Sequence, residues 1–368
     1  MVLREECMAD HSAPTRNLPA LTGLRGVASV WVVFYHTLKH VPVVASGYAG
    51  VDIFFVLSGF VLSHVYLRDS TLGNAKGYAT FLGARLARIY PLHLFSLLFL
   101  LGVLLVLPHF AQRYPDPGAR FSSGAFFASL LLIQNWAHWR INCWNTPAWS
   151  LSAEWLAYLC FPFLLVMLRK LRASIAVTLA LAFFTLSSAI GLLFLSGDHM
   201  LSGTTGRNGL VRMAGEFVAG CFIYLAYLKG WRMPQIVGLT LLIVLLAVGM
   251  AGNKTPLSFA LVLAAVPVVL MAAQEGNLFS KFLETKPIIF LGEISFSIYM
   301  MHWIVIQIFN WLSDHGMEWN WFLLKTVTLL TVLGLSIGTY QFIELPARKW
   351  GRYLARVPRP IPVEAATG

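Results

Sequence analysis

Apolar runs of about 20 residues recur along most of the 368-residue chain, and they constrain its fold more than any other feature. A run of that length is what an α-helix needs to cross the roughly 30 Å hydrocarbon core of a bilayer. The chain is 58% hydrophobic and only 12% charged, with a mean hydropathy of +0.70, whereas a soluble domain carries about 25% charged residues. Because too few polar residues remain to cover a globule in water, the sequence predicts an all-α membrane protein.

The apolar runs differ in length, and one of them is too short to cross. They lie near 21–41, 49–67, 89–108, 124–136, 148–168, 173–195, 209–228, 235–251, 257–273, 288–312 and 321–343. The run 124–136 is only about two thirds as long as a spanning helix, so we expect it to be a re-entrant or interfacial segment. About ten transmembrane helices remain.

The positions of Lys and Arg support this topology. With the N-terminus inside and 124–136 not crossing, most basic residues fall on the inner side, as the positive-inside rule requires. A crossing at 124–136 would instead turn the basic cluster 169–172 outward. We therefore expect residues 1–20 to be a cytoplasmic tail, 21–343 a membrane domain that begins with a retained signal anchor, and 344–368 a basic cytoplasmic tail.

The net charge of +11 and the four cysteines exclude other classes of protein. The basic residues lie in short clusters between apolar runs, so few are left to form a stripe that follows nucleic-acid phosphates. The cysteines form no CxxC or CxxxC pair, which argues against a zinc site or a structural disulfide. The chain also has no GxSxG, HExxH or Walker motif.

Ionisable side chains inside apolar runs are costly, so each is a candidate for function. Arg25 and His36 are eleven residues apart in the first run, about 1100° around a helix, so they share a face with roughly 16 Å between them along the axis. The alternative is a snorkelling arginine with an unrelated interhelical histidine.

The second run combines an acidic residue with several glycines. Asp52, near the outer end, could pair with His36 and set its tautomer, or it could simply cap the helix. Gly47, Gly50 and Gly59 permit another backbone to approach closely.

Arg85 and Arg88, shortly before Tyr90, are predicted to open the third run on the cytoplasmic side. Two guanidinium groups one turn apart make a phosphate clamp. Basic residues at this place also serve to orient the helix, and that explanation stays open.

Two further polar stripes lie on later runs: Ser150, Glu154 and Tyr158 on one, and Ser295, Tyr299 and His302 on the other. Together with His36 and Asp52, Glu154 and His302 could converge near the outer half of the bundle. Such a set of side chains suits general acid–base chemistry on a hydroxyl group. Ordinary hydrogen bonding between helices would give the same pattern.

Six motifs in order resemble those of the acyltransferase 3 family of membrane O-acyltransferases. They are Arg-X10-His (25–36), GVDIFFVLSGF (50–60), RLARIYPL (85–92), WSLSAEW (149–155), LGEISFSIYMMH (291–302) and FIELPARKW (342–350). Thr22, Ala153 and Trp155 depart from the usual pattern, and Thr22 replaces an aspartate that the family often has. The resemblance covers nearly the whole chain.

The resemblance implies ten core helices in the bacterial inner membrane and transfer of an acyl group, commonly acetyl from acetyl-CoA. The implied acceptor is a carbohydrate hydroxyl of an exopolysaccharide, an O-antigen or a lipid-linked glycan, and no metal is implied. We expect the phosphates of acyl-CoA to be bound by Arg25, Arg85, Arg88 and Tyr90. We expect His36 to act as the base or to carry the acyl group. Asp52, Glu154 and His302 are expected either to orient this base or to bind hydroxyl groups of the sugar.

Two other functions remain open on the residues alone. A secondary transporter or channel is also polytopic with intramembrane ionisable groups, although paired halves with broken helices are not visible here. A non-catalytic partner of a polysaccharide assembly machine would not need the polar stripes.

Overall fold

Helices build the part of the chain that the structure, a computed structural model, describes. This part comprises residues 18–38, 42–68, 72, 74–136, 144–252, 254–317 and 319–355, and it contains no β-strand. Most of each predicted tail, residues 1–17 and 356–368, therefore lies outside the described residues.

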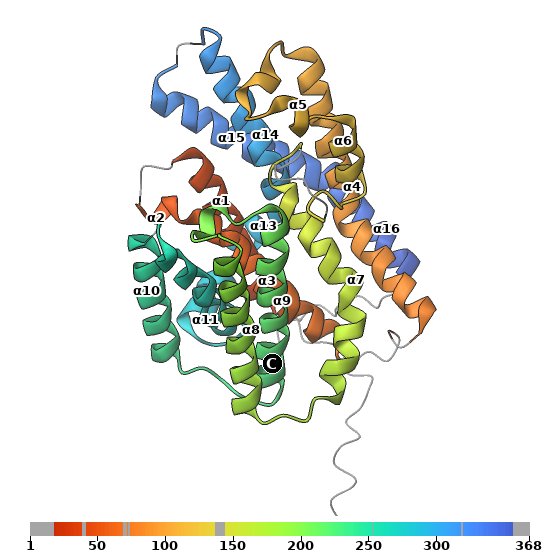
Figure 1. The fold of residues 1–368 in the computed structure, drawn as a ribbon, viewed down its shortest axis with the longest axis vertical. Coiled ribbons are helices and arrows are strands. Elements are labelled where there is room, and N and C mark those ends of the chain that lie inside the picture. Colours follow the sequence, from red (N-terminus) through yellow and green to blue (C-terminus); the bar gives the residue numbers. More distant parts are fainter. Residues whose placement is uncertain are drawn as a thin grey trace, which may run out of the picture.

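The longer helices form a bundle, and shorter helices connect them (Figure 1). The α-helices are α1 (Pro19–Thr37), α2 (Pro42–Ala45), α3 (Gly50–Tyr66), α4 (Ala75–Val106), α5 (Pro117–Arg120), α6 (Ser123–Leu130), α7 (Ala148–Lys170), α8 (Ile175–Leu195), α9 (Gly206–Leu228), α10 (Gln235–Ala251), α11 (Ala260–Ala273), α12 (Leu278–Leu283), α13 (Lys286–Glu293), α14 (Ser295–Asp314), α15 (Trp321–Thr339) and α16 (Leu345–Ala355). A π-helical turn, η6 (Tyr340–Glu344), joins α15 to α16.

Seven helices of the described residues are long and apolar enough to cross a membrane, and an eighth is added if α13 and α14 count as one span. The run predicted at 288–312 is therefore broken, because α13 and α14 meet at an angle of 66°. The helices α1 and α10, of 19 and 17 residues, stand where two further spans are predicted. The all-α membrane fold is confirmed, while the number of about ten crossings stays a prediction.

The direction of α7 shows that the run 124–136 does not cross. Its helix α6 has 8 residues, about 12 Å of helix against a core of roughly 30 Å. At the end of α7, Arg169 donates to the carbonyl oxygens of Tyr66 and Leu67 at 2.9 and 3.0 Å, at the end of α3. Because α3 and α7 end together, they run in the same direction, with α4 as the crossing between them.

The structure corrects the position of Arg85 and Arg88 on their helix. The helix α4 begins at Ala75, where the side chain of Asn74 accepts a hydrogen bond from the Gly77 amide at 2.8 Å. Its first turns are helical although they are polar, so they lie before the apolar run predicted at 89–108. The two arginines therefore do not open the helix. Arg85 lies about 15 Å along it, inside the bundle.

Glycines allow the most central helices to touch backbone to backbone. A Cβ atom on Gly59 of α3 would lie 2.0 Å from the carbonyl oxygen of Phe217 in α9, and Gly220 of α9 meets α3 in the same way. Cβ atoms on Gly47 and Gly50 would lie 2.2 and 2.6 Å from backbone carbonyl oxygens of α1. The predicted close approach at Gly47, Gly50 and Gly59 is thus confirmed.

The segment expected as a basic tail begins as a helix, α16, that packs along α4 (Figure 1). A Cβ atom on Gly351 would lie 2.4 Å from the Cβ atom of Ala87. Just before α16, the buried Glu344 accepts a hydrogen bond from Ser297 of α14 at 2.9 Å. Residues 344–355 are therefore part of the helical body.

We expect a cysteine introduced at position 170 to be labelled only from the cytoplasmic side. Lys170 is exposed at the end of α7, and the positive-inside rule places this basic cluster in the cytoplasm. The measurement uses a membrane-impermeant maleimide on intact cells and on inverted vesicles, in a parent whose four cysteines are replaced by serine. Labelling of intact cells would show that the topology is inverted.

Candidate active site

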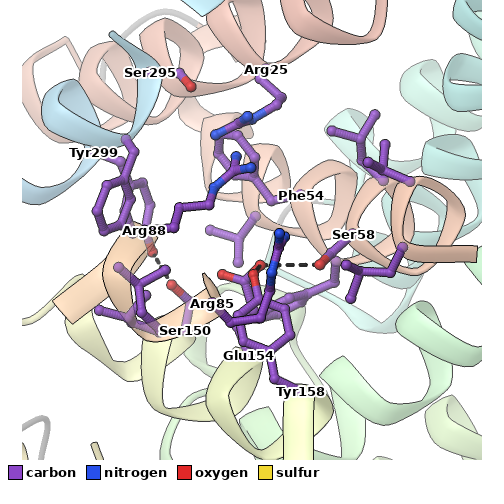
Figure 2. Close-up of a pocket in the computed structure, with 18 residues that line it drawn as sticks. Arg25, Phe54, Ser58, Arg85, Arg88, Ser150, Glu154, Tyr158, Ser295 and Tyr299 are labelled. Atoms are coloured by element: carbon purple, nitrogen blue, oxygen red, sulfur yellow. Dashed lines mark hydrogen bonds between the residues drawn. The ribbon is translucent and has the colours of Figure 1, made fainter. Parts of the chain in front are cut away.

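Five helices, α1, α3, α4, α7 and α14, enclose a cavity of about 120 Å³ in the bundle (Figure 2). We call it the arginine cavity, because three arginine side chains reach it. Its polar lining consists of Arg25, Ser58, Arg85, Arg88, Ser150, Glu154, Tyr158, Ser295 and Tyr299. The cavity thus joins residues from five of the six predicted motifs, which are distant in sequence.

The arginine cavity has more positive than negative charge. Arg25 and Arg88 enter it from α1 and α4 (Figure 2), and neither forms a hydrogen bond or an ion pair with any described residue. Arg85 donates only a long bond of 3.5 Å, to the Tyr66 hydroxyl. A guanidinium group stays charged in proteins, and Glu154 is the one carboxylate in the lining. The cavity is therefore suited to an anionic group.

Glu154 is held in place through one of its two carboxylate oxygens. Its Oε1 accepts hydrogen bonds from Ser58 of α3 at 3.1 Å and from Tyr158, one turn further along α7, at 2.5 Å. Its Oε2 has no partner among the described residues. The predicted stripe on α7 thus faces the cavity, and it presents a fixed carboxylate oxygen to whatever binds there.

Two hydroxyl groups close one end of the arginine cavity. The Ser150 and Tyr299 oxygens are 2.7 Å apart, and each lies 3.1 Å from the carbonyl oxygen of Pro147. Each hydroxyl can donate only one hydrogen, so the two hydroxyls cannot make all three contacts as hydrogen bonds at once, and more than one arrangement is available to the pair.

Next to this end lies a pair of histidine rings. The ring centroids of His36 and His302 are 5.3 Å apart, and His302 lies 5.8 Å from the ring of Tyr299. The Nδ1 atom of the buried His302 is 2.7 Å from the carbonyl oxygen of Tyr299. Because a carbonyl oxygen only accepts, Nδ1 carries the hydrogen, and Nε2 of the neutral ring is left as an acceptor. This Nε2 has no partner in the described part of the chain.

The predicted convergence of the two histidines is therefore found in the structure, although neither ring lines the arginine cavity. Tyr299 connects the two regions, because it lines the cavity and its ring lies 5.8 Å from that of His302. The three arginines and the two histidines therefore lie in neighbouring regions of the bundle.

Asp52 does not pair with His36. Its carboxylate accepts two hydrogen bonds from Arg212 of α9, at 2.8 and 2.6 Å, and both side chains are buried. The backbone contact at Gly59 brings α9 against α3, which places Arg212 opposite Asp52. Asp52 is thus an ion-pair partner that ties α3 to α9.

Sequence reasoning missed Arg212 and the buried Glu216, whose Oε1 lies 3.5 Å from the Arg212 guanidinium. The signal was present, because both are ionisable residues inside an apolar run, four positions apart. Tyr90, predicted to bind the donor, lies outside the lining of the arginine cavity, with its ring 6.3 Å from that of His93.

No group of three or more His, Cys, Asp or Glu side chains within the described ranges is arranged to hold a metal ion. Cys160 and Cys221 are free thiols, and the other two cysteines, Cys7 and Cys143, lie outside the described residues.

A family model described as an acyltransferase domain matches residues 18–341. The chain is 31% identical to the acyltransferase MdmB of Streptomyces mycarofaciens, over 79% of each chain. It is 25% identical to the O-acetyltransferase OatA of Staphylococcus aureus, over 91% of this chain and 58% of that one. The putative peptidoglycan O-acetyltransferase YrhL of Bacillus subtilis is also 25% identical, with 91% and 56% covered. The chain thus spans little more than half the length of OatA and YrhL. No solved structure matches it.

Proposed function

This chain belongs to the acyltransferase 3 family, whose domain covers residues 18–341, and from that premise we propose that it moves an acetyl group from acetyl-CoA to a hydroxyl of a carbohydrate. The acceptor class is an exopolysaccharide, an O-antigen or a lipid-linked glycan. Two of its relatives are named O-acetyltransferases, and for one of them the name gives peptidoglycan as the acceptor. This supports a glycan hydroxyl as the acceptor.

The observation that carries the proposal is the arginine cavity. CoA bears phosphate groups, and guanidinium groups bind phosphate through charge-assisted, often paired hydrogen bonds. Arg25 and Arg88 have their donors unused by the described residues, so a phosphate can take them without breaking an existing ion pair. The thioester arm then extends past Glu154 towards Tyr299 and the histidines.

In the proposed reaction, the acceptor hydroxyl attacks the thioester carbonyl carbon. A new C–O bond forms, the C–S bond breaks, and CoA leaves as a thiolate. His36 takes the hydroxyl proton and returns it to the thiolate, so that no proton is gained or lost overall. Alternatively, His36 carries the acyl group itself before it passes to the hydroxyl. His302, with its acceptor nitrogen beside His36, orients the base or binds a sugar hydroxyl.

We place the protein in the bacterial inner membrane, with both termini in the cytoplasm. The basic inner loops support this orientation, and the common direction of α3 and α7, which end together at Arg169, puts the basic clusters after both helices on the same side. The donor phosphates then bind at the cytoplasmic part of the arginine cavity, where Arg25 and Arg85 lie.

We expect Arg88→Ala to weaken binding of acetyl-CoA by roughly 10- to 150-fold, because one charged hydrogen-bonding group is worth about 1.5–3 kcal/mol. Arg85→Ala is expected to act in the same direction. Isothermal titration of the purified protein with acetyl-CoA measures both, and insertion and monodispersity are checked by size exclusion.

The matched control is Arg113→Ala. Arg113 is partly exposed and pairs with Asp314, the last residue of α14, whereas the cavity is lined by the first turns of that helix. The substitution should leave acetyl-CoA affinity unchanged. Unchanged affinity in folded Arg88→Ala and Arg85→Ala would reduce these arginines to orientation signals and contradict the proposed donor site.

A further inference from the structure

A fourth arginine, Arg348, lies near the arginine cavity on α16. Its Nη1 atom lies 3.4 Å from Oε1 of Glu344, one turn earlier. Glu344 is 2% exposed, and its other oxygen accepts a hydrogen bond from Ser297 of α14 at 2.9 Å. Apart from this contact with Glu344, the guanidinium donors of Arg348 have no partner among the described residues.

The π-helical turn η6 contains Glu344 and sets the direction in which α16 leaves. A π-helical turn inside a helix adds a residue to the turn and is frequently found at functional sites. Here it turns Glu344 towards α14 and lets α16 lie along α4. Gly351 of α16 meets Ala87, the residue before Arg88, so closely that no side chain fits between the two helices.

This packing brings Arg348 to the edge of the arginine cavity. Arg348 lies one turn before Gly351, and the contact of Gly351 with Ala87 places this part of α16 beside the turn of α4 that carries Arg88, although Arg348 is not part of the cavity lining. The side chain is 32% exposed, so it can contact a ligand outside the cavity as well as the charges within it.

The size of the cavity explains why a site at its edge is needed. Pockets that enclose a whole drug-sized ligand measure roughly 300–1,000 Å³, whereas the arginine cavity measures about 120 Å³. A donor with an adenine nucleotide at one end cannot fit inside it. If the thioester arm occupies the cavity, the nucleotide must remain outside, beside the helices that form its edge.

We propose that Arg348, held by Glu344 on α16, binds a phosphate at the nucleotide end of the acyl-CoA donor. The inference rests on the proposed function, since it takes acyl-CoA as the donor. It adds a subsite at the edge of the cavity that binds the phosphate on the ribose of the nucleotide, while Arg25 and Arg88 bind the diphosphate that joins the nucleotide to the thioester arm. Arg348 therefore determines which thioesters the protein accepts.

The test compares two donors, acetyl-CoA and S-acetylpantetheine, which lacks the nucleotide and all phosphates. Arg348→Ala is expected to weaken binding of acetyl-CoA by roughly tenfold, as for loss of a charged hydrogen bond at a partly exposed site. It should leave binding of S-acetylpantetheine unchanged. Arg348→Lys should recover part of the affinity for acetyl-CoA.

Lys349→Ala is the matched control, because it removes one positive charge from the exposed side of the same helix, and it should bind both donors normally. Unchanged acetyl-CoA affinity in Arg348→Ala, or an equal loss for both donors, would overturn the inference. If Arg348→Ala binds normally while Arg88→Ala does not, the proposed function stands without this subsite. If the unsubstituted protein binds no acetyl-CoA, both fail.

Discussion

His36→Gln is expected to lower the rate of acyl transfer by at least about a hundredfold, the usual contribution of a general base, while the protein still inserts and binds acyl-CoA. Glutamine keeps hydrogen-bonding capacity but cannot cycle a proton. The His36 ring lies beside the buried His302. Transfer of label from acetyl-CoA to the acceptor, together with donor affinity, measures the two effects separately.

Two comparisons sharpen this experiment. His302→Ala should impair transfer if its free Nε2 acts on the base or the acceptor, and be near normal if the ring only packs. His199→Gln, an exposed histidine between α8 and α9, should behave like the unsubstituted protein. A folded His36→Gln protein with substantial turnover would contradict the assignment and move attention to Glu154 or His302.

Gly59→Ala is expected to destabilise the protein by about 3 kcal/mol, at the upper end of what overpacking costs. The new methyl group would lie 2.0 Å from the backbone oxygen of Phe217, and a backbone atom cannot move aside as a flexible side chain can. The helices α3 and α9 must separate, which also strains the ion pair between Asp52 and Arg212. Thermal unfolding in detergent micelles measures the loss.

Gly102→Ala provides the control for that loss, because nothing lies within 4 Å of its Cβ position on α4. It should be neutral or slightly stabilising, since alanine favours a helix over glycine by about 1 kcal/mol. Equal stability of the Gly59→Ala and Gly102→Ala proteins would show that α3 and α9 do not touch as described.

The sequence predicts most reliably what depends on one helix at a time. The stripe of Ser150, Glu154 and Tyr158 follows from helical periodicity, and the structure places all three on the cavity. Apolar runs of sufficient length likewise indicate where helices lie, because the bilayer sets their length. For the same reason the short run 124–136 could be recognised as not crossing.

Contacts between distant helices could not be predicted in the same way. On the sequence alone Asp52 could pair with His36 or cap its helix, whereas its pairing with Arg212 depends on which backbone packs against Gly59. The start of α4 lies before the predicted apolar run because its first turns are polar, and the break between α13 and α14 falls at Ile294, inside an apolar run that predicts a single span. The place of Arg348 beside the arginine cavity depends on the π-helical turn before α16.

The most direct test of the account is transfer itself. Purified protein is incubated with acetyl-CoA labelled in the acetyl group and with candidate polysaccharides or lipid-linked glycans. The account predicts label in an alkali-labile ester on the glycan, release of free CoA in equal amount, and loss of both with His36→Gln. Label that stays in acetyl-CoA with every glycan, although the folded protein binds the donor, would contradict it.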